Sequence, residues 1–346
     1  MKRTLETLFQ ATSLTRAQAV SAMELMMSEQ TPFEQVAAAL GALRTKKETP
    51  DEVAGFAAAI RAHSTPVPCT RKDLMDNCGT GGDQAGTFNI STAAAFVLSA
   101  GGLGVAKHGN RSVSSRCGSA DVLEALGVPV DLPPVAAGRA LDQLGFAFLF
   151  SVRFHPGLAR VGAVRRALGV PTIFNILGPL VNPAPVTHQL VGVYDGKLAE
   201  TMAYVLRDRG LQQAMVVTGE GGLDEVSLQG ATAVVHLREG RIEHGVITPE
   251  DAGLARAPLT ALQGGQHAVE NAAIIESIFS GEKGPRRDVV CLNAAAGFLV
   301  CGKVQGLREG VALAQALLDS GAARARLAEL RSFTGASTGA STGASK

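Results

Sequence analysis

The residues best suited to chemistry are the glycines and the aspartate of "DNCGTGGDQAGTFNIST", residues 76–92. A loop with few side chains lets a large anion lie against backbone N–H groups, and a helix starting after it adds unpaired N–H groups. The stretch matches neither of the two common nucleotide-binding patterns, because no Lys follows the second Gly and Gln84 stands where a third Gly is required. It therefore predicts binding of another kind of anion, with an ordinary tight turn as the alternative.

A second candidate is "KHGNRSVSSRCGSAD", residues 107–121, which follows the apolar run "GLGVA". Lys107 and Arg111 stand there among serines and glycines. Cations and small hydrogen-bond donors of this kind suit a multiply charged phosphate ester. The alternative is that Lys107 and His108 are ordinary surface residues.

Two further segments carry charges. "GGLDEVS" (221–227) places Asp224 and Glu225 in a loop, where hard oxygen ligands suit Mg²⁺ shared with substrate phosphates. Taken alone, an Asp–Glu pair in a loop is usually only solvated. The segment 154–184 carries Arg165 and Arg166, which lie about 100° apart on a helix and so do not face one site.

These segments need elements to position them. Residues 1–64 have helical spacing throughout, and "TRAQ" (15–18), "TPFE" (31–34) and "TPDE" (49–52) predict helix starts capped by their threonines. From about residue 72, strand-like runs at 188–194 and 213–219 flank a helical run closed by Gly210. This alternation predicts a largely parallel sheet with helices on its faces. A hairpin is expected at Glu239–Gly240, and "HSTPVPC" is a candidate hinge.

Composition narrows the class of protein. The 346 residues carry a net charge of +1 and no Trp, which argues against a protein that mainly covers a nucleic-acid backbone. Five cysteines without a C-x-x-C pattern indicate reduced thiols, and no apolar run approaches roughly 18 residues. We therefore expect a soluble, cytoplasmic protein with no membrane partner. The repetitive ending, residues 334–346, is expected to be a disordered tail.

Taken in order, "GTGGD", "NIST", "KHGNRSVSS..GSADVLEALG", "FNILGPLVNP" and "DEVS" resemble the anthranilate phosphoribosyltransferases. This family joins anthranilate to phosphoribosyl pyrophosphate (PRPP) in tryptophan biosynthesis. The resemblance runs from the helical start to about Phe333. Two departures are that the family more often has Gly in place of Gln84, and that the TGAS repeats lie outside the shared region.

The resemblance implies an α/β protein with a small all-helical domain beside a larger α/β domain. The larger domain has a mostly parallel central sheet flanked by helices and is similar to that of pyrimidine nucleoside phosphorylases. The implied domains are 1–70, with a returning segment near 160–185, and 71–333. A homodimer through the helical domain is also implied.

The resemblance also assigns site residues. Those that would bind PRPP are Gly79, Gly82, Asp83, Thr87, Asn89, Ile90, Ser91, Thr92, Lys107, His108, Gly109, Asn110, Arg111, Ser112, Val113, Ser114, Ser115 and Ser119. Gly79, Asn110 and Arg165 would bind anthranilate, and Ser91, Asp224 and Glu225 would bind two Mg²⁺ ions. No acid–base dyad is assigned. Lys107 and Arg165 would act by charge stabilisation and positioning, and His108 would shape the loop.

Two other functions stay open at this point. A nucleoside phosphorylase-like enzyme would bind free phosphate and a nucleobase, and would not need the two metal-binding carboxylates. A catalytically silent relative would bind nucleic acid through a basic surface. The Asp224–Glu225 pair argues against the first, and the near-zero net charge argues against the second.

Overall fold

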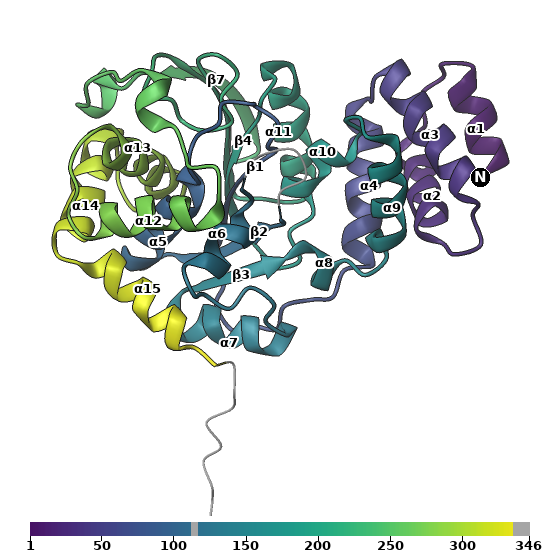
Figure 1. Cartoon of the computed structure of the whole chain (residues 1–346). Helices are drawn as coiled ribbons and strands as arrows, with labels where there is room; N and C mark the ends of the chain where they lie inside the picture. The colour runs from purple at the N-terminus through teal and green to yellow at the C-terminus, as the bar shows by residue number, and fades with distance from the viewer. Residues whose placement is uncertain (112–116, 335–346) are drawn as a thin grey trace, which may run out of the picture.

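A computed structural model of the chain shows a small helical bundle beside a larger α/β body (Figure 1). It describes residues 1–111 and 117–334. The predicted site residues Ser112, Val113, Ser114 and Ser115, and the predicted tail from residue 335 onward, lie outside these ranges. The bundle is built from α1 (Lys2–Phe9), α2 (Arg16–Met27), α3 (Phe33–Lys46) and α4 (Pro50–Ala62).

The starts of these helices test the capping predictions. Thr15 and Thr49 each accept a hydrogen bond from the backbone N–H three residues on, and both form complete capping boxes, so these two predictions are confirmed. The prediction for Thr31 is wrong, because α3 begins at Phe33 with Pro32 as its N-cap. The carbonyl of Thr31 instead accepts a hydrogen bond from the Arg160 guanidinium, a tertiary contact that local spacing does not reveal.

The sheet is mixed but mostly parallel. Its strands are β1 (Leu74–Gly79), β2 (Gly104–Gly109), β3 (Phe146–Phe150), β4 (His188–Gly192), β5 (Gln213–Gly219), β6 (Thr232–Arg238) and β7 (Arg241–Ile247). They lie in the order β3-β2-β1-β4-β5-β6-β7, and every pair from β3 to β5 is parallel. The last two pairs are antiparallel, and the predicted hairpin is confirmed, with left-handed φ at Glu239 (50°) and Gly240 (75°).

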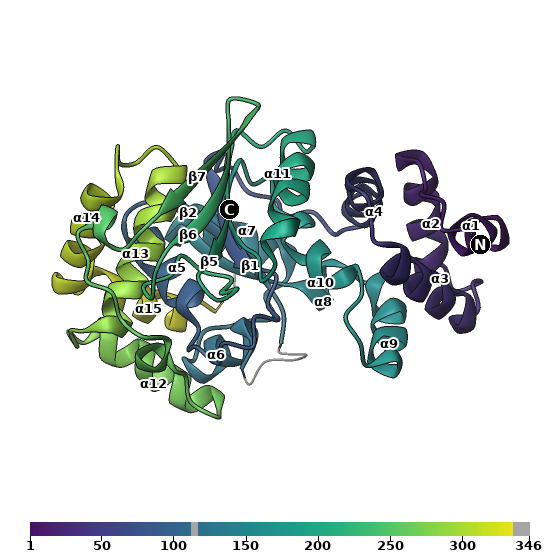
Figure 2. The same ribbon diagram turned by 90° about the horizontal axis from the view of Figure 1, so that it is seen from above.

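Helices cover both faces of the sheet (Figures 1 and 2). On one face, α5 (Ile90–Ala100) and α13 (Pro285–Val300) form the inner layer. Outside them lie α12 (Ala268–Phe279), α14 (Leu307–Asp319) and α15 (Ala322–Ser332). The opposite face is covered by α7 (Pro134–Leu144) over β2 and β3, and by α11 (Ala199–Asp208) over β5 and β6. This arrangement confirms the predicted α/β class.

Short elements complete the chain. They are α6 (Ser119–Ala125), α8 (Ser151–Phe154), α9 (Leu158–Leu168), α10 (Phe174–Leu177), η1 (Gly178–Leu180), η2 (Gly196–Leu198), η3 (Glu250–Ala252) and η4 (Leu259–Leu262). Of these, α9 packs against α2 and α3 of the bundle. One hydrophobic cluster, which includes Phe56 of α4, Ile173 before α10 and Met202 of α11, runs from the bundle into the α11 face of the sheet.

The topology also indicates where a site should lie. From β1 the chain proceeds outward to β2 and β3, then returns to β4 on the other side of β1. In an open sheet of this kind, ligands bind beyond the carboxyl ends of the strands at such a reversal, here between β1 and β4. All five cysteines are free thiols, and no helix among the described residues is long and apolar enough to cross a membrane.

Candidate active site

The glycine-rich loop after β1 has an unusual backbone. Gly81, Gly82, Gln84 and Gly86 all have left-handed φ values, of 67°, 85°, 55° and 67°. Backbone of this conformation turns successive N–H groups toward one side and forms a concave site for an anion. Gln84 is the one residue of the four with a Cβ, and it holds a backbone conformation that glycine adopts without strain.

The first turn of α5 follows directly. The side chain of Asn89, its N-cap, makes no bond to the helix and donates instead to the carbonyl of Cys117, 3.2 Å away. The hydroxyl of Thr92 is buried and has no hydrogen-bond partner among the described residues. The Thr92 hydroxyl is therefore an unused donor at this helix end, beside the loop, which suits a bound anion.

Asp224 and Glu225 reach this loop from the turn after β5. Asp224 Oδ2 accepts the backbone N–H of Gly81 at 2.7 Å, and Glu225 Oε1 accepts that of Ser91 at 3.0 Å. The structure thus brings together the predicted metal ligands and the predicted PRPP loop, although they are far apart in sequence.

The two carboxyls have perturbed acidities. Burial raises the pKa of Asp224 well above its ordinary value, and the nearby Asp83 and Glu225 carboxyls raise it further. Burial also raises the pKa of Glu225 to about 7, while the charge of Lys107 opposes that shift. Acidic groups crowded in this way favour a cation between them.

Their oxygens fit Mg²⁺ as the donor set. Within residues 1–111 and 117–334, no group of three or more His, Cys, Asp or Glu side chains is arranged to hold a metal alone. Mg²⁺ is typically bound through one or two carboxylates, with waters and substrate phosphates completing its shell. The residues present therefore fit an ion that is shared with a phosphate ligand.

Lys107, 2% exposed, lies beneath these groups. Its Nζ donates to the carbonyl of Asn77 at 2.6 Å and to Ser91 Oγ at 3.4 Å. A small cavity of about 10 Å³ nearby has Asn77, Ser91, Gly192 and Glu225 in its lining. A buried positive charge is thus fixed directly under the predicted phosphate and metal residues.

His108 points away from Lys107, toward η1. Its Nδ1 lies 3.0 Å from the carbonyl of Gly178, and its Nε2 lies 3.2 Å from Nε2 of His155. A carbonyl only accepts, so the His108 proton is on Nδ1 and His155 donates from its Nε2. Burial lowers the pKa of His108 to about 3 and that of His155 to about 4. Both rings are neutral near pH 7, which argues against His108 as a strong base.

The described part of the second loop is held by Asn110 and Ser119. Ser119 Oγ and the N–H of Ala120 donate to the Asn110 carbonyl at 3.4 and 3.3 Å. A Cβ on Gly109 would lie 2.4 Å from Ser119 Oγ and 2.8 Å from the Phe148 ring, so a larger residue here would have to displace both side chains. The Arg111 guanidinium instead pairs with carboxylates on α6, Asp121 at 3.0 Å and Glu124 at 2.8 Å.

Arg165 stands apart from the hydrogen-bonded cluster. It lies in the last turn of α9, half-buried, with its guanidinium 5.3 Å from the centre of the Phe174 ring. Burial lowers its pKa. The neighbouring Arg166 is exposed, so the two arginines do differ in environment as their spacing predicts.

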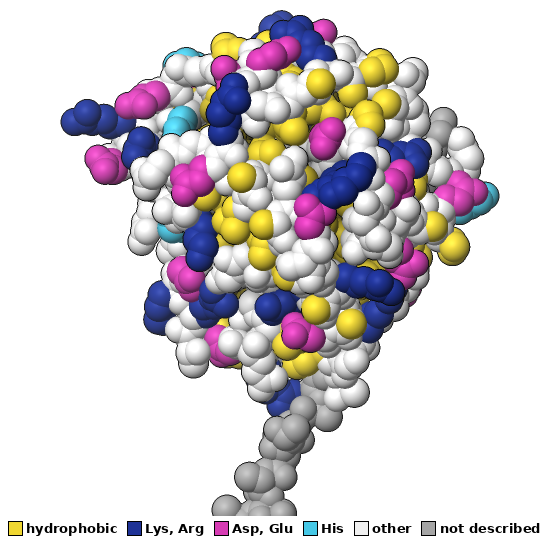
Figure 3. All heavy atoms as spheres, turned by 90° about the vertical axis from the view of Figure 1, so that its left-hand side faces the viewer, with side chains coloured by type: hydrophobic (Ala, Val, Ile, Leu, Met, Phe, Trp, Pro, Cys, Tyr) yellow, Lys and Arg dark blue, Asp and Glu magenta, His cyan; other side chains and the backbone are white. Residues whose placement is uncertain are grey.

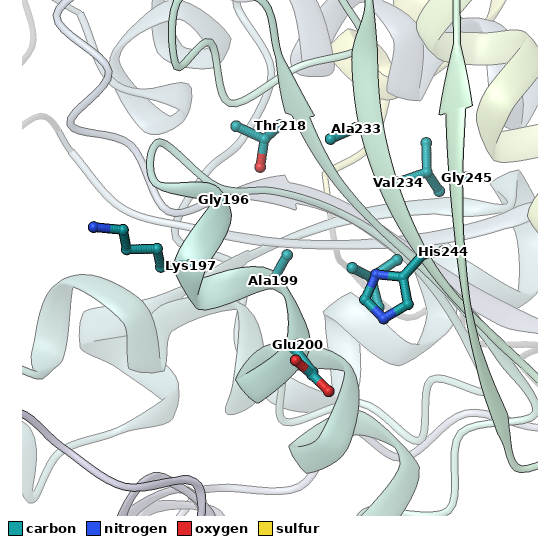
Figure 4. Close-up of a pocket in the computed structure, with 10 residues that line it drawn as sticks. Gly196, Lys197, Ala199, Glu200, Thr218, Ala233, Val234, His244 and Gly245 are labelled. Atoms are coloured by element: carbon teal, nitrogen blue, oxygen red, sulfur yellow. The ribbon is translucent and has the colours of Figure 1, made fainter.

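A larger cavity, of about 220 Å³, lies elsewhere (Figure 4). It is lined by residues of η2, α11 and strands β5 to β7, among them Lys197, Glu200, Thr218 and His244. None of the predicted site residues lines it.

Comparison with known proteins places the chain. Residues 2–64 match the glycosyl transferase family, helical bundle domain, and residues 71–324 match the glycosyl transferase family, a/b domain. A protein from Moorella thermoacetica named anthranilate phosphoribosyltransferase is 51% identical over 314 residues, which are 91% of this chain and 92% of that protein. One of the same name from Petrotoga mobilis is 50% identical over 90% of this chain and 91% of its own length.

The chain belongs to the anthranilate phosphoribosyltransferase family. Solved structures of the family agree with this. The crystal structure of the Thermus thermophilus anthranilate phosphoribosyltransferase superposes with a TM-score of 0.90 at 44% identity, covering 95% of this chain and 98% of that one. The Saccharomyces cerevisiae anthranilate phosphoribosyltransferase in complex with PRPP and Mg has a TM-score of 0.84 at 29% identity, covering 94% and 95%.

Sequence reasoning missed three buried residues, Asn77, Asp76 and Asn182, whose hydrogen bonds connect the segments of the site. Asn77 donates to the carbonyl of Ser91 at 2.7 Å, and its position just before the glycines was the available signal. Asp76 is fully buried and accepts the N–H of His108 at 3.2 Å and the side-chain amide of Asn182 at 2.8 Å. Asn182 lies in the quoted "FNILGPLVNP" motif, but no spacing rule connects it to Asp76.

Proposed function

We propose that this chain transfers the phosphoribosyl group of PRPP to the amine of anthranilate, giving N-(5-phosphoribosyl)anthranilate and pyrophosphate in tryptophan biosynthesis. The observation that carries the proposal is the pair of hydrogen bonds from Gly81 and Ser91 to Asp224 and Glu225. They join an anion-binding loop and metal-binding carboxylates into one site, as PRPP bound with a metal requires. Family membership and the named relatives support the choice of anthranilate as acceptor.

We propose that PRPP is held by the residues that the resemblance assigns to it. In the described part of the chain, the N–H groups of Gly81 and Ser91 that bond to Asp224 and Glu225 support this assignment. Ser91, Asp224 and Glu225 would hold Mg²⁺, and we propose two ions per site. Bound Mg²⁺ would neutralise the charge that develops on the departing pyrophosphate. The Saccharomyces cerevisiae relative forms a complex with PRPP and Mg, which supports Mg²⁺ as the metal.

The protein's own groups act by positioning and charge. Lys107 and the N–H groups of the glycine-rich loop are fixed before the reaction, so they stabilise a leaving anion without reorganising. Anthranilate carries an aromatic amine that is neutral at pH 7, so its nitrogen needs no strong base to attack the anomeric carbon. Arg165, whose planar guanidinium suits a carboxylate, would orient anthranilate from the α9 side together with Gly79 and Asn110.

Larger-scale features complete the proposal. We place the domain boundary in the connection after α4 (up to residue 70), with the segment near 160–185 returning to the helical domain. The packing of α9 on α2 and α3 supports that return. A homodimer through the helical domain is supported by Phe9 and Phe33, which are 66% and 48% exposed there. Free thiols throughout fit a reducing compartment, the cytoplasm.

A nucleic-acid-binding role receives no support from the surface in view. On the face shown in Figure 3, Lys and Arg side chains are interspersed with Asp and Glu, without a continuous basic area. Binding to a phosphate backbone depends on such an area.

The decisive assay follows the fluorescence of anthranilate with PRPP and Mg²⁺, and repeats it with each omitted or with the metal chelated. We expect consumption only when all three are present. The double variant Asp224→Ala, Glu225→Gln should lose this turnover, whereas Asp251→Ala, Glu250→Gln, an adjacent acidic pair on the exposed η3 turn, should retain it. Undiminished activity in the first variant, or phosphorolysis of nucleosides by the wild type instead, would overturn the proposal.

A further inference from the structure

The turn that carries Asp224 lies directly on two paired glycines. Gly79 at the end of β1 is opposite Gly192 at the end of β4 in the sheet register. A Cβ built on Gly192 would lie 1.6 Å from the backbone oxygen of Asp224, and one built on Gly79 would lie 2.3 Å from its Oδ2. Real side chains do not approach this closely, so any residue with a Cβ at position 192 must displace the Asp224 backbone.

The requirement for glycine at position 192 comes from this contact and not from the backbone conformation of Gly192. Gly192 is a buried strand residue and is not among the glycines with left-handed φ, so its own backbone would accept other residues. The three atoms nearest to the added Cβ all belong to Asp224. The absence of a side chain at position 192 thus leaves room for the turn that carries Asp224 and Glu225.

A second contact holds the same turn, from helix α13. Asn293, on α13 and 1% exposed, accepts the N–H of Val226 at 2.9 Å and donates to the carbonyl of Val226 at 3.0 Å. Its amide also donates to the carbonyl of Val289 at 2.9 Å, within its own helix. Both backbone groups of Val226, the residue after Glu225, are thereby tied to a rigid helix that otherwise buries apolar side chains here.

We propose that Gly192 and Asn293 are positioning residues for the metal site, Gly192 by leaving room for the Asp224 backbone and Asn293 by fixing the residue after Glu225. The inference rests on the proposed metal role of Asp224 and Glu225. Outer partners that orient metal ligands change metal affinity about 10- to 100-fold when they are replaced. Gly192 lies against the Asp224 backbone and Asn293 bonds to the Val226 backbone, so both would act through the two carboxylates.

The test measures binding of Mn²⁺ in the presence of pyrophosphate by electron paramagnetic resonance, without turnover. Gly192→Ala should weaken binding about 10- to 100-fold. Gly245→Ala is the matched control, because Gly245 is a strand residue of the same sheet with no atom within 4 Å of its added Cβ. Asn293→Leu, which keeps the side-chain size and removes all three hydrogen bonds, should weaken binding in the same range.

A further readout separates positioning from general damage. At saturating Mg²⁺ and PRPP, the KM for anthranilate should change far less than the Mn²⁺ affinity in both variants. Of the three residues proposed to bind anthranilate, only Gly79 lies against the turn that carries Asp224, while Arg165 lies on α9. A disrupted fold would raise the KM for anthranilate and the dissociation constant for Mn²⁺ together. Circular dichroism and melting temperature without ligands establish whether each variant is folded.

The outcomes are distinguishable. A wild-type protein that fails to bind Mn²⁺ with pyrophosphate, or an Asp224→Ala, Glu225→Gln variant that binds it normally, would overturn the proposed metal site itself. Folded Gly192→Ala or Asn293→Leu protein with wild-type Mn²⁺ affinity would overturn only the positioning role. If Gly192→Ala fails to fold, the Mn²⁺ affinity of Asn293→Leu tests the positioning role. If neither variant folds, the positioning role is overturned, because both residues are then needed for the stability of the whole domain.

Discussion

The buried pair His108 and His155 predicts a specific dependence of stability on pH. Their pKa values, lowered by burial to about 3 and about 4, lie below the ordinary value of 6.5. The folded protein keeps both rings neutral, while the unfolded chain protonates them below pH 6.5. The free energy of unfolding therefore falls as the pH drops from 6.5 toward 4, and this loss is absent above pH 6.5.

The magnitude follows from the width of that window. Each pH unit between the unfolded and folded pKa costs about 1.4 kcal/mol for each buried histidine. Between pH 8 and pH 5, only the interval of about 1.5 units below the unfolded pKa of 6.5 contributes. The free energy of unfolding therefore falls by about 2 kcal/mol over this range from His155 alone. His155 also contributes to lowering the pKa of His108, so removing it eases part of the second penalty.

The perturbation is His155→Gln, which keeps a hydrogen-bond donor for His108 and cannot titrate in this range. Urea denaturation at pH 8 and pH 5 would give the free energy of unfolding at each pH, and the readout is the difference between them. We expect this difference to be smaller by at least about 2 kcal/mol than in the wild type. His63→Gln, at an exposed position after α4, controls for loss of a histidine. An equal pH dependence in wild type and His155→Gln would refute the reasoning.

Three further predictions concern the site. Arg165→Ala should raise the KM for anthranilate about 10- to 100-fold, because it removes a charged hydrogen-bonded pair, and should change the KM for PRPP far less. Steady-state kinetics measure both constants, and equal effects on the two would contradict the role of Arg165. Lys107→Met keeps the length of the side chain and removes its charge, so kcat should fall about 100- to 1000-fold, and a near-normal kcat in the folded variant would exclude charge stabilisation by Lys107. Gln84→Gly relieves a left-handed φ that costs roughly 1 kcal/mol, partly offset by the greater freedom of glycine in the unfolded chain, so a thermal melt should show a small rise in Tm, not a fall.

Much of the fold could be predicted because its signals are local. The capping boxes at Thr15 and Thr49, the strand at 213–219 and the turn at Glu239–Gly240 depend on residues a few positions apart, and the structure confirms them. The predicted cap at Thr31 is wrong, and the carbonyl of this residue is bound by a distant arginine, Arg160, a contact that local spacing does not reveal.

The candidate site likewise contains residues that local motifs predict and residues that only distant contacts reveal. Motifs located the glycine-rich loop, Lys107 and the Asp224–Glu225 pair, because each has a distinctive composition. Residues that only support them, such as Gly192 and Asn293, carry no signal in their own neighbourhood. Gly192 and Asn293 matter because the backbone of residues 224–226 packs against them from another part of the chain. A single sequence does not show that these segments lie in contact.

The packing of α9 has a consequence for synthesis of the chain. Val161 and Val164 of α9 belong to the same hydrophobic cluster as Val36 and Leu40 of α3. The bundle therefore gains this part of its core only when the ribosome has added roughly 120 residues after α3, about 6 to 25 seconds at ordinary elongation rates. During that interval the first helices leave the ribosome with apolar surface uncovered, a surface open to chaperones and to self-association until α9 arrives.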